Sequence, residues 1–334
     1  MWRLHPRFVG PYAEADTLAT IALWKYTREK IINAELQNIL ELELSLIPML
    51  IKMRKQGIKV DTDRAEVLRE ELTQKKKDTL KEIYRKFGCN VDVWASKSLA
   101  SAFDHNSIEY GTTPKGAPSF TKEFLANHPH ELPQMILRCR KIEKTINTFV
   151  EGMILKQSFN SRIHCELHPL KSDDGGTVSG RFSCSNPNLQ QTSARDPEFG
   201  PLVRSLFLPE KGSLWGALDY SSQEPRLTVH YSALTNQQGS TEAVRMFNTD
   251  PRTDYHQMVA DLANIDRKPA KTLNLGLAYG MGEVKLCESL GLPTEWVTGF
   301  NGKQRQTAGN EGKALIEAYH EKVPFVRGLT DTCS

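Results

Sequence analysis

A chain of 334 residues is long enough for about two domains, and 39% hydrophobic with 25% charged residues is typical of a soluble globular protein. The 43 lysines and arginines against 40 acidic residues give a net charge of only +3, so charge alone decides nothing about partners. Six scattered cysteines argue against a zinc ribbon or a disulfide framework, and no apolar run approaches the roughly 20 residues that span a bilayer. We therefore expect a cytoplasmic protein with no membrane partner.

The first half of the chain is predicted to be helical. Apolar residues recur at a helical period through 12–52, and the glycine-led stretch 57–61 predicts a short strand or turn. Asp61 or Asp63 is the expected N-cap of the next helix, and Gly88 is its expected end. Two further long helices are predicted, at 64–87 and 133–159.

The second half mixes strands and helices. Residues 162–170 alternate like a strand, and the apolar run 214–218 predicts a short buried strand that ends at Asp219. Helical patterns return at 223–232 and 253–290. The predicted fold class is therefore α+β, helix-rich at first, then a small sheet, then helices again.

Asp219 is a candidate metal ligand. A carboxylate at the mouth of a buried strand has a rigid support and reaches solvent, which suits Mg²⁺ because this ion prefers one or two carboxylates together with phosphate oxygens. An aspartate before a helix is equally a common N-cap, and spacing alone does not separate the two interpretations.

One predicted helix carries two cations, an apolar residue and an aromatic residue at intervals of four: Arg267, Lys271, Leu275 and Tyr279. At 100° per residue these positions drift only about 40° around the axis, so they share one face. Such a face suits phosphates at its charged end and a flat base at the other. An ordinary amphipathic surface helix is the alternative, but Gly276 and Gly280 inside it would then cost roughly 1 kcal/mol each without purpose.

Three stretches, read together, resemble the family A (DNA polymerase I-like) DNA polymerases. Residues 219–226 match D-Y-S-x-x-E-x-R, and residues 267–280 match R-x-x-x-K-x-x-x-(F/Y)-G-x-x-Y-G except at Leu275. Residues 177–190 match T-x-x-G-R-(F/L)-S-x-x-x-P-N-L-Q. Three motifs in this order over about 100 residues form a highly specific signal.

The resemblance implies a right-hand polymerase architecture with thumb, partial palm and fingers. It assigns 1–40 to a remnant of a 3′-5′ exonuclease domain with its connector, and 41–165 to the start of the polymerase domain and the thumb. The palm would be 166–235, with a small antiparallel sheet, and incomplete fingers would be 236–334. Tyr12 and Asp16 resemble the last exonuclease motif, but its D-x-E partner is absent, so we interpret them as a remnant and claim no exonuclease activity for this chain.

The resemblance also implies roles for individual residues in nucleotidyl transfer from a dNTP to a primer 3′-hydroxyl. Asp219 would hold two Mg²⁺ ions with the backbone carbonyl of Tyr220, as a two-metal displacement requires. Glu224 would be the steric gate against ribose. The remaining nucleotide contacts would come from the phosphate-binding His256, Arg267 and Lys271, from Leu275 at the sugar and from Tyr279 near the templating base.

Primer-template DNA is the second implied partner. Arg181 would lie at the primer terminus, where minor-groove acceptors allow pair geometry to be checked without reading sequence. Asn188, Gln190 and Arg226 would lie on the duplex nearby. Arg140 and Lys144 would belong to a basic thumb helix that holds phosphates, although alone they read as a solvated helix face. The expected cellular setting is a bacterium or a phage-infected cell.

Two departures qualify the resemblance. No His-Asp-Glu-like motif with the second catalytic carboxylate follows Gly280, so we expect little polymerisation by this chain alone. A truncated reading frame, an intron-interrupted gene, and a split enzyme completed by a second polypeptide with the C-terminal palm all stay open, as does a non-catalytic DNA-binding fragment. Leu275 replaces the usual Phe or Tyr, and with the wording of residues 223–226 it resembles phage polymerases more than cellular ones.

Overall fold

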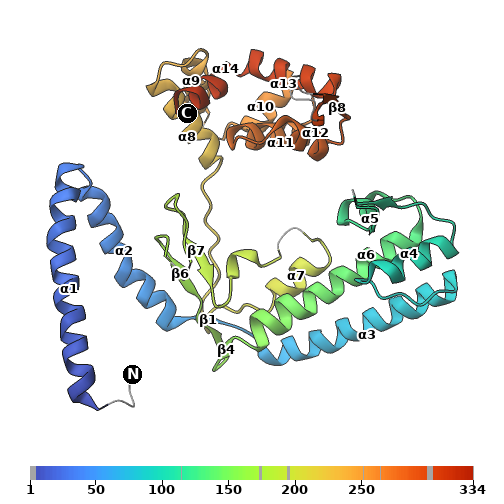
Figure 1. The fold of residues 1–334 in the computed structure, drawn as a ribbon, viewed down its shortest axis with the longest axis horizontal. Helices are drawn as coiled ribbons and strands as arrows, with labels where there is room; N and C mark the ends of the chain where they lie inside the picture. The colour runs from blue at the N-terminus through green and yellow to red at the C-terminus, as the bar shows by residue number, and fades with distance from the viewer. Residues whose placement is uncertain are drawn as a thin grey trace. The chain divides into compact units, whose positions relative to one another are not determined.

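The computed structural model describes residues 5–113, 115–172, 175–193, 196–250, 252–263, 265–298 and 304–333. The chain forms two compact units, Met1–Trp215 and Gly216–Ser334 (Figure 1). Both are rich in helices, and the described strands form small antiparallel sheets, which confirms the predicted α+β class. Within the described ranges, no helix combines the length and the apolar character needed to cross a membrane.

The first unit begins with two helices, which confirms the helical prediction for 12–52. Helix α1 spans Pro6–Asn33 and α2 spans Gln37–Gln56. The chain turns between them at Glu35, whose φ of 55° is left-handed and cannot continue a helix (Figure 1). Apolar periodicity runs through this turn without a glycine or proline to mark it, so the sequence did not indicate where the first helix ends. None of the residues in α1 and α2 is buried.

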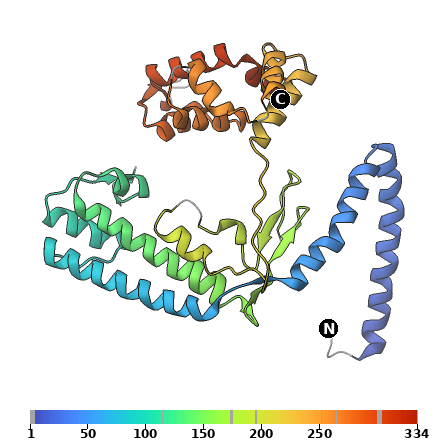
Figure 2. The ribbon, with the colours of Figure 1, turned by 180° about the vertical axis from the view of Figure 1, so that it is seen from behind.

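A long helical pair forms the middle of the first unit. Helix α3 (Thr62–Phe87) lies beside α6 (Glu131–Lys144), which continues into the π-helix η1 (Thr145–Leu155), and Figures 1 and 2 show the pair from opposite sides. The pair encloses an apolar core that includes Leu68, Leu72 and Val150.

The predicted ends of α3 are confirmed. Asp61 caps the helix by accepting the backbone N–H of Arg64 at 2.9 Å. Gly88 closes it in the left-handed conformation, with φ of 66°. Both signals are local in the chain, so the sequence was sufficient to locate them.

A second apolar cluster lies at the far end of the same pair of helices. It contains Phe103, Phe120, Leu125 and Ile136, all buried. These residues come from α6 and from the elements that connect α3 to it: α4 (Ser96–His105), β2 (Gly111–Thr112), β3 (Pro118–Ser119) and α5 (Lys122–Asn127).

Besides the antiparallel pair of β2 with β3, two further small antiparallel sheets are described in the first unit. The first has the order β1-β5-β4, built from β1 (Ile58–Lys59), β5 (Arg162–Ile163) and β4 (Ser158–Phe159). The second pairs β6 (Glu166–His168) with β7 (Ser183–Ser185), with Leu167 opposite Cys184. The predicted strand at 162–170 is therefore divided between two sheets. Helix α7 (Phe199–Arg204) follows them.

The predicted buried strand at 214–218 is wrong. These residues are extended but belong to no strand, and the Leu214 and Leu218 side chains are 95% and 99% exposed. A strand is stabilised by a ladder of hydrogen bonds to a neighbour, and no described residue forms a strand pair with this segment. An apolar run supplies the side chains of a strand but not the partner.

The second unit is a helical cluster with one β-hairpin. Val259, Leu273, Tyr319 and Phe325 are buried at its centre. The pattern predicted as helical over 253–290 forms three separate helices, and the hairpin was not predicted. The elements are α8 (Gln223–Leu234), α9 (Ser240–Thr249), α10 (Tyr255–Ala263), α11 (Arg267–Ala278), α12 (Glu283–Leu290), β8 (Thr294–Thr298), β9 (Gln304–Ala308), α13 (Asn310–Lys322) and α14 (Pro324–Cys333).

Candidate functional site

Helix α11 carries the predicted phosphate-binding face, but it ends earlier than expected. Ala278 is its last residue, and Gly280 follows in the left-handed conformation with φ of 68°. The N–H of Met281 donates to the carbonyl of Gly276 at 2.8 Å, and that of Gly280 to Leu277 at 3.1 Å. This is a Schellman ending, in which a glycine satisfies the last carbonyls of a helix. Gly280 therefore terminates α11 and does not interrupt it.

Gly276 lies within α11 for a packing reason. An added Cβ would lie 3.2 Å from Sδ of Met281 and 3.3 Å from Cδ1 of Leu286. The glycine lets Met281 and the neighbouring helix α12 approach α11 closely. This close packing accounts for a glycine at position 276.

A cavity of about 170 Å³ lies between α8, α10 and α11 in the second unit. Four of the predicted nucleotide contacts line it: Glu224, His256, Leu275 and Tyr279. These residues are up to 55 positions apart in the sequence, so the fold brings them together. The cavity wall also includes Asn274 and Tyr255, neither of which the sequence singled out.

Glu224 and Tyr279 are linked directly across the wall of this cavity. The phenolic hydroxyl of Tyr279 donates a hydrogen bond to Oε1 of Glu224. Glu224 lies in the first turn of α8 and Tyr279 is the C-cap of α11. The bond therefore fixes the carboxylate of the predicted steric gate relative to the C-terminal end of α11.

The surroundings of His256 favour the neutral form of its imidazole. Burial lowers the pKa of its imidazole below the ordinary value, and the positive charges of Lys271 and Arg267 lower it further, while Asp254 opposes them. Its Nδ1 lies 3.1 Å from Nδ2 of Asn274. The imidazole thus offers a hydrogen bond and not a full positive charge.

Arg267 opens α11 and forms a two-pronged ion pair with Asp254. Its Nε lies 2.8 Å and its Nη2 2.7 Å from Oδ2 of Asp254. The other oxygen of Asp254 accepts the backbone N–H groups of His256 and Gln257 at 3.0 and 3.1 Å, which caps α10. Lys271, one turn further along α11, is exposed. The two cations therefore differ in how strongly the protein holds them.

Asp219 and Tyr220 lie in the exposed extended segment before α8. A carboxylate and a backbone carbonyl are oxygen donors of the kind that Mg²⁺ prefers. In the part of the chain that the structure describes, however, no group of three or more His, Cys, Asp or Glu side chains is arranged to hold a metal ion. Asp219 stays a candidate ligand.

Three predicted DNA contacts lie in and beside a loop of the first unit. Arg181 is exposed just before β7, and Asn188 and Gln190 follow that strand. The Asn188 side chain caps the short 3₁₀ helix η2 (Leu189–Gln191) by accepting the N–H of Gln190 at 3.1 Å. Nε2 of Gln190 donates to the carbonyl of Phe182 at 3.2 Å. Both amides therefore help to shape the loop that carries Arg181.

Arg140 is held inside the first unit, whereas Lys144 is exposed at the end of α6. Arg140 donates from Nε to the carbonyl of Val93 at 2.6 Å and from Nη1 to that of Phe120 at 2.8 Å. Its guanidinium also lies over the Trp94 ring, 5.0 Å from the centroid. Arg140 thus joins α6 to two loops, a role that the sequence did not predict.

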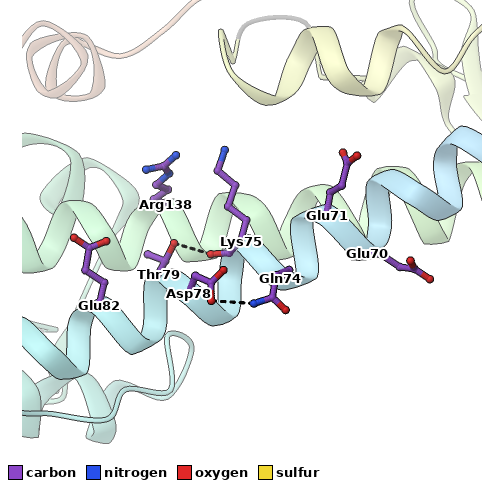
Figure 3. Close-up of a pocket in the computed structure, with 8 residues that line it drawn as sticks. All are labelled: Glu70, Glu71, Gln74, Lys75, Asp78, Thr79, Glu82 and Arg138. Carbon is purple, nitrogen blue, oxygen red and sulfur yellow. Dashed lines mark hydrogen bonds between the residues drawn. The ribbon is translucent and has the colours of Figure 1, made fainter.

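A neighbouring face of α3 and α6 carries mixed charges and forms a shallow depression of about 600 Å³. Figure 3 shows Lys75 and Arg138 pointing to the same side of the two helices, with Glu71 and Glu82 nearby. Lys75 and Arg138 both pair with Glu198, the N-cap of α7. Lys141 pairs with Asp196 at 3.0 Å. These cations hold α7 against the helical pair.

Arg226, in the first turn of α8, is also engaged within its own unit. Its Nε donates to the carbonyl of Ser221 at 3.0 Å, and its guanidinium lies over the Phe247 ring, 4.7 Å from the centroid. These contacts tie the segment before α8 to α9.

Sequence reasoning missed Asp254 and Asn274. Asp254 lies at the start of the range 253–290 that was predicted to be helical and directly before the observed α10, so an N-cap signal was present, but its pairing with Arg267 depends on the tertiary fold. Asn274 lies in the interior of α11, where asparagine has poor helix propensity, and that mismatch is the signal that a specific contact holds it there.

Comparison with known proteins decides the family. The model of DNA polymerase family A matches residues 62–334. The chain belongs to DNA polymerase family A. It is 34% identical to a DNA-directed DNA polymerase of Pseudomonas phage M6, an alignment that covers 100% of this chain and 55% of that protein. It is 32% identical to the DNA polymerase DpoZ of Salmonella phage PMBT28, with 97% of this chain and 55% of that protein covered.

Cellular relatives of this family A chain are less similar. DNA polymerase I of Pseudomonas aeruginosa is 27% identical over 95% of the chain and 33% of its own length. This confirms the predicted likeness to phage polymerases. The chain spans about half the length of the phage relatives that it matches.

A solved structure is similar in fold to this family A chain. It is the POL domain of Pol1 from M. smegmatis in complex with DNA primer-template and dNTP. The TM-score is 0.66 at 25% identity, and the match covers 86% of this chain and 48% of that one.

Proposed function

We propose that this chain is the part of a phage-type DNA polymerase that binds the incoming dNTP and the primer-template during nucleotidyl transfer to the primer 3′-hydroxyl. The observation that carries the proposal is the cavity of the second unit, where Glu224, His256, Leu275 and Tyr279 meet beside the cations of α11. Family membership and the dNTP in the M. smegmatis complex support a nucleotide as its occupant.

Within this proposal, different residues in and beside the cavity bind the phosphates, the sugar and the base of the dNTP. Arg267, Lys271 and His256 bind the phosphates, the first two through charge and the third through a neutral hydrogen bond. Glu224 and Leu275 face the sugar, where the carboxylate excludes a ribose 2′-hydroxyl. Tyr279 presents its ring toward the base pair.

The proposed domain plan follows the resemblance. Residues 1–40 correspond to the exonuclease remnant and connector, 41–165 to the thumb region, 166–235 to the palm and 236–334 to the fingers. The residues that then contact the duplex are Arg140, Lys144, Arg181, Asn188, Gln190 and Arg226. Such contacts to phosphates are independent of sequence and sensitive to salt.

Asp219 and the carbonyl of Tyr220 provide part of a Mg²⁺ site in this proposal. Metal ions are used by family A polymerases, and two Mg²⁺ ions would supply Lewis-acid activation when bound. Asp219 is the single carboxylate among the candidate metal ligands. This favours a second proposed function, in which the chain binds primer-template DNA and reaches full activity only together with a polypeptide that carries the C-terminal palm.

Nucleotide binding tests the first proposal directly. Equilibrium binding of dATP to the 334-residue chain should weaken at least tenfold when Arg267 and Lys271 are both replaced by Ala, because each loses a charge-assisted contact to phosphate. Arg245→Ala is a matched control, since Arg245 pairs with Glu242 on the exposed face of α9 and does not line the cavity. Equal affinity in all three proteins would contradict the proposal.

Primer extension distinguishes the two proposed functions, a chain that is active alone and one that needs a second polypeptide. The chain is assayed with Mg²⁺ and dNTPs alone, and then with a polypeptide that carries the missing carboxylate motif. We expect extension only in the second assay, and Asp219→Asn should abolish it. Extension by the chain alone would contradict the need for the second carboxylate.

A further inference from the structure

Asn274 is an asparagine inside a helix with half of its amide unpaired. It is only 4% exposed, and its Nδ2 lies 3.1 Å from Nδ1 of His256 on the neighbouring helix α10. Its Oδ1 is buried and has no hydrogen-bond partner among the described residues. Both residues line the proposed nucleotide cavity. A buried amide oxygen without a partner is unfavourable, so this asparagine requires an explanation other than stability.

The contact fixes the chemistry of the imidazole. An asparagine amide donates from its nitrogen or accepts at its oxygen, and a neutral imidazole has one protonated and one bare nitrogen. When the amide nitrogen donates to Nδ1, that nitrogen is bare and the proton lies on Nε2. When the amide is reversed, Nδ1 carries the proton and Nε2 becomes an acceptor. The orientation of one amide therefore decides what the far side of His256 offers.

The electrostatic surroundings favour a neutral ring. Lys271 and Arg267 of α11 repel a proton on His256, Asp254 at the start of α10 attracts one, and Glu224 of α8 lines the same cavity. Burial acts in the same direction as the two cations and lowers the pKa of the imidazole. With a neutral ring, its single proton lies on either Nδ1 or Nε2, and the amide decides between them.

We propose that Asn274 is a positioning residue that donates to Nδ1 of His256 and so keeps the imidazole proton on Nε2, where it can be given to a polyphosphate. The proposal rests on the proposed function, since it takes the triphosphate of a dNTP as the ligand. Phosphate oxygens are acceptors only, so a bare Nε2 would repel them and a protonated Nε2 binds them. Arg267 and Lys271 supply charge, and Asn274 ensures that the third group is a donor.

The tautomer is measured without any ligand. Nitrogen NMR of the ¹⁵N-labelled 334-residue chain, with the His256 signals assigned by their loss in His256→Gln, distinguishes a bare from a protonated ring nitrogen. We expect a bare Nδ1 and a protonated Nε2. In Asn274→Asp the carboxylate accepts from Nδ1, so the proton should move to that nitrogen. A proton on Nδ1 of the unsubstituted chain would overturn the proposal.

Binding of dATP tests whether the effect passes through His256. Asn274→Leu and Asn274→Asp should each weaken binding about three- to tenfold, the range expected for one lost hydrogen bond. In a His256→Gln background, Asn274→Leu should change the affinity less than twofold, because the group that it positions is gone. An equal loss in both backgrounds would show a merely structural role.

The two proposals fail in different ways. If the unsubstituted chain binds no dATP, the proposed function is wrong. The ring-nitrogen measurement decides the role of Asn274 toward His256 whether or not a nucleotide binds.

Discussion

Asp254 joins two helices through its two carboxylate oxygens, one on Arg267 and one on the first N–H groups of α10. Burial acts to raise the pKa of this carboxyl. The pKa nevertheless lies below the ordinary value of 3.8, because other interactions outweigh the effect of burial. They are the hydrogen bond and positive charge of Arg267 and the hydrogen bonds from the backbone N–H groups of Gln257 and His256. A carboxylate with a depressed pKa stabilises the fold above its unfolded-state pKa, and that stabilisation is lost as pH falls through the folded-state value.

We therefore predict a pH-dependent difference between the wild type and Asp254→Asn. Asparagine is also a good N-cap, so the variant removes mainly the ion pair with Arg267. The wild type should unfold at higher denaturant concentration at pH 7, and the difference should shrink as pH falls below about 4. Chemical denaturation across this range measures it, and a difference that does not change with pH would contradict the assignment.

Arg140 and Lys144 lie four residues apart on α6 and should respond differently to loss of charge. Arg140→Gln removes two donors to the carbonyls of Val93 and Phe120, so we expect about 2 kcal/mol lower stability of the first unit. Lys144→Gln should leave stability unchanged. It should reduce the slope of log binding affinity against log salt concentration by about one, because one phosphate contact to the duplex is lost. Denaturation and binding titrations at several salt concentrations test both, and the reverse pattern would contradict the structure.

At the scale of single elements, signals that are local in the chain predicted the structure well. Asp61 and Gly88 were placed correctly as the ends of α3, and α8 appeared where its pattern began. The same reasoning failed where structure depends on distant partners. Residues 214–218 have the side chains of a strand but no described ladder neighbour, and the hairpin of β8 and β9 carries no strong alternation.

The candidate site shows the same difference between local signals and tertiary contacts. Four of the residues that line the cavity were named from the sequence: Leu275 and Tyr279 because spacing on one helix puts them on one face, and Glu224 and His256 through the resemblance to family A polymerases. Their mutual contacts could not be predicted, since Glu224 meets Tyr279, and Asn274 meets His256, only after three helices pack. The internal engagement of Arg140 is likewise a tertiary property.

In the π-helix η1 we predict that a Gly→Ala substitution lowers the stability of the protein, the opposite of its usual effect within an α-helix. Gly→Ala inside an ordinary helix stabilises by about 1 kcal/mol. At Gly152 an added Cβ would lie 2.6 Å from the carbonyl oxygen of Asn147, so the backbone must shift. We expect Gly152→Ala to destabilise the first unit by about 1–3 kcal/mol.

Thermal or chemical denaturation of Gly152→Ala measures this effect. Gly10→Ala is the matched control, because Gly10 lies in helix α1 with nothing within 4 Å of an added Cβ, and it should not destabilise the chain. A more stable Gly152→Ala would show that the tight π-helical turn is absent.

At the scale of the whole molecule, the segment before α8 should be the preferred site of proteolysis. Leu214, Trp215, Leu218 and Tyr220 are 60–99% exposed and lie in extended backbone outside any described strand or helix. Exposed segments of this kind enter protease active sites without prior unfolding. Brief chymotrypsin treatment should first yield two fragments that meet within 214–220.

Trypsin provides the comparison, because no lysine or arginine lies between Lys211 and Arg226. Its cleavage pattern should lack any cut within 212–225. Mass spectrometry of the first fragments identifies both patterns. Early chymotryptic cleavage elsewhere, with 214–220 intact, would show that this segment is protected in solution.

Under the proposed function, the ion pair of Arg267 also bears on how long a phosphate-containing product would stay bound. A phosphate that approaches this guanidinium meets a charge already partly balanced by Asp254, so the attraction is weaker than for a lone arginine. An enzyme that repeats one step many times gains little from tight retention of the group that it must release. In a polymerase, an arginine shared with an aspartate would favour departure of pyrophosphate and so the next addition.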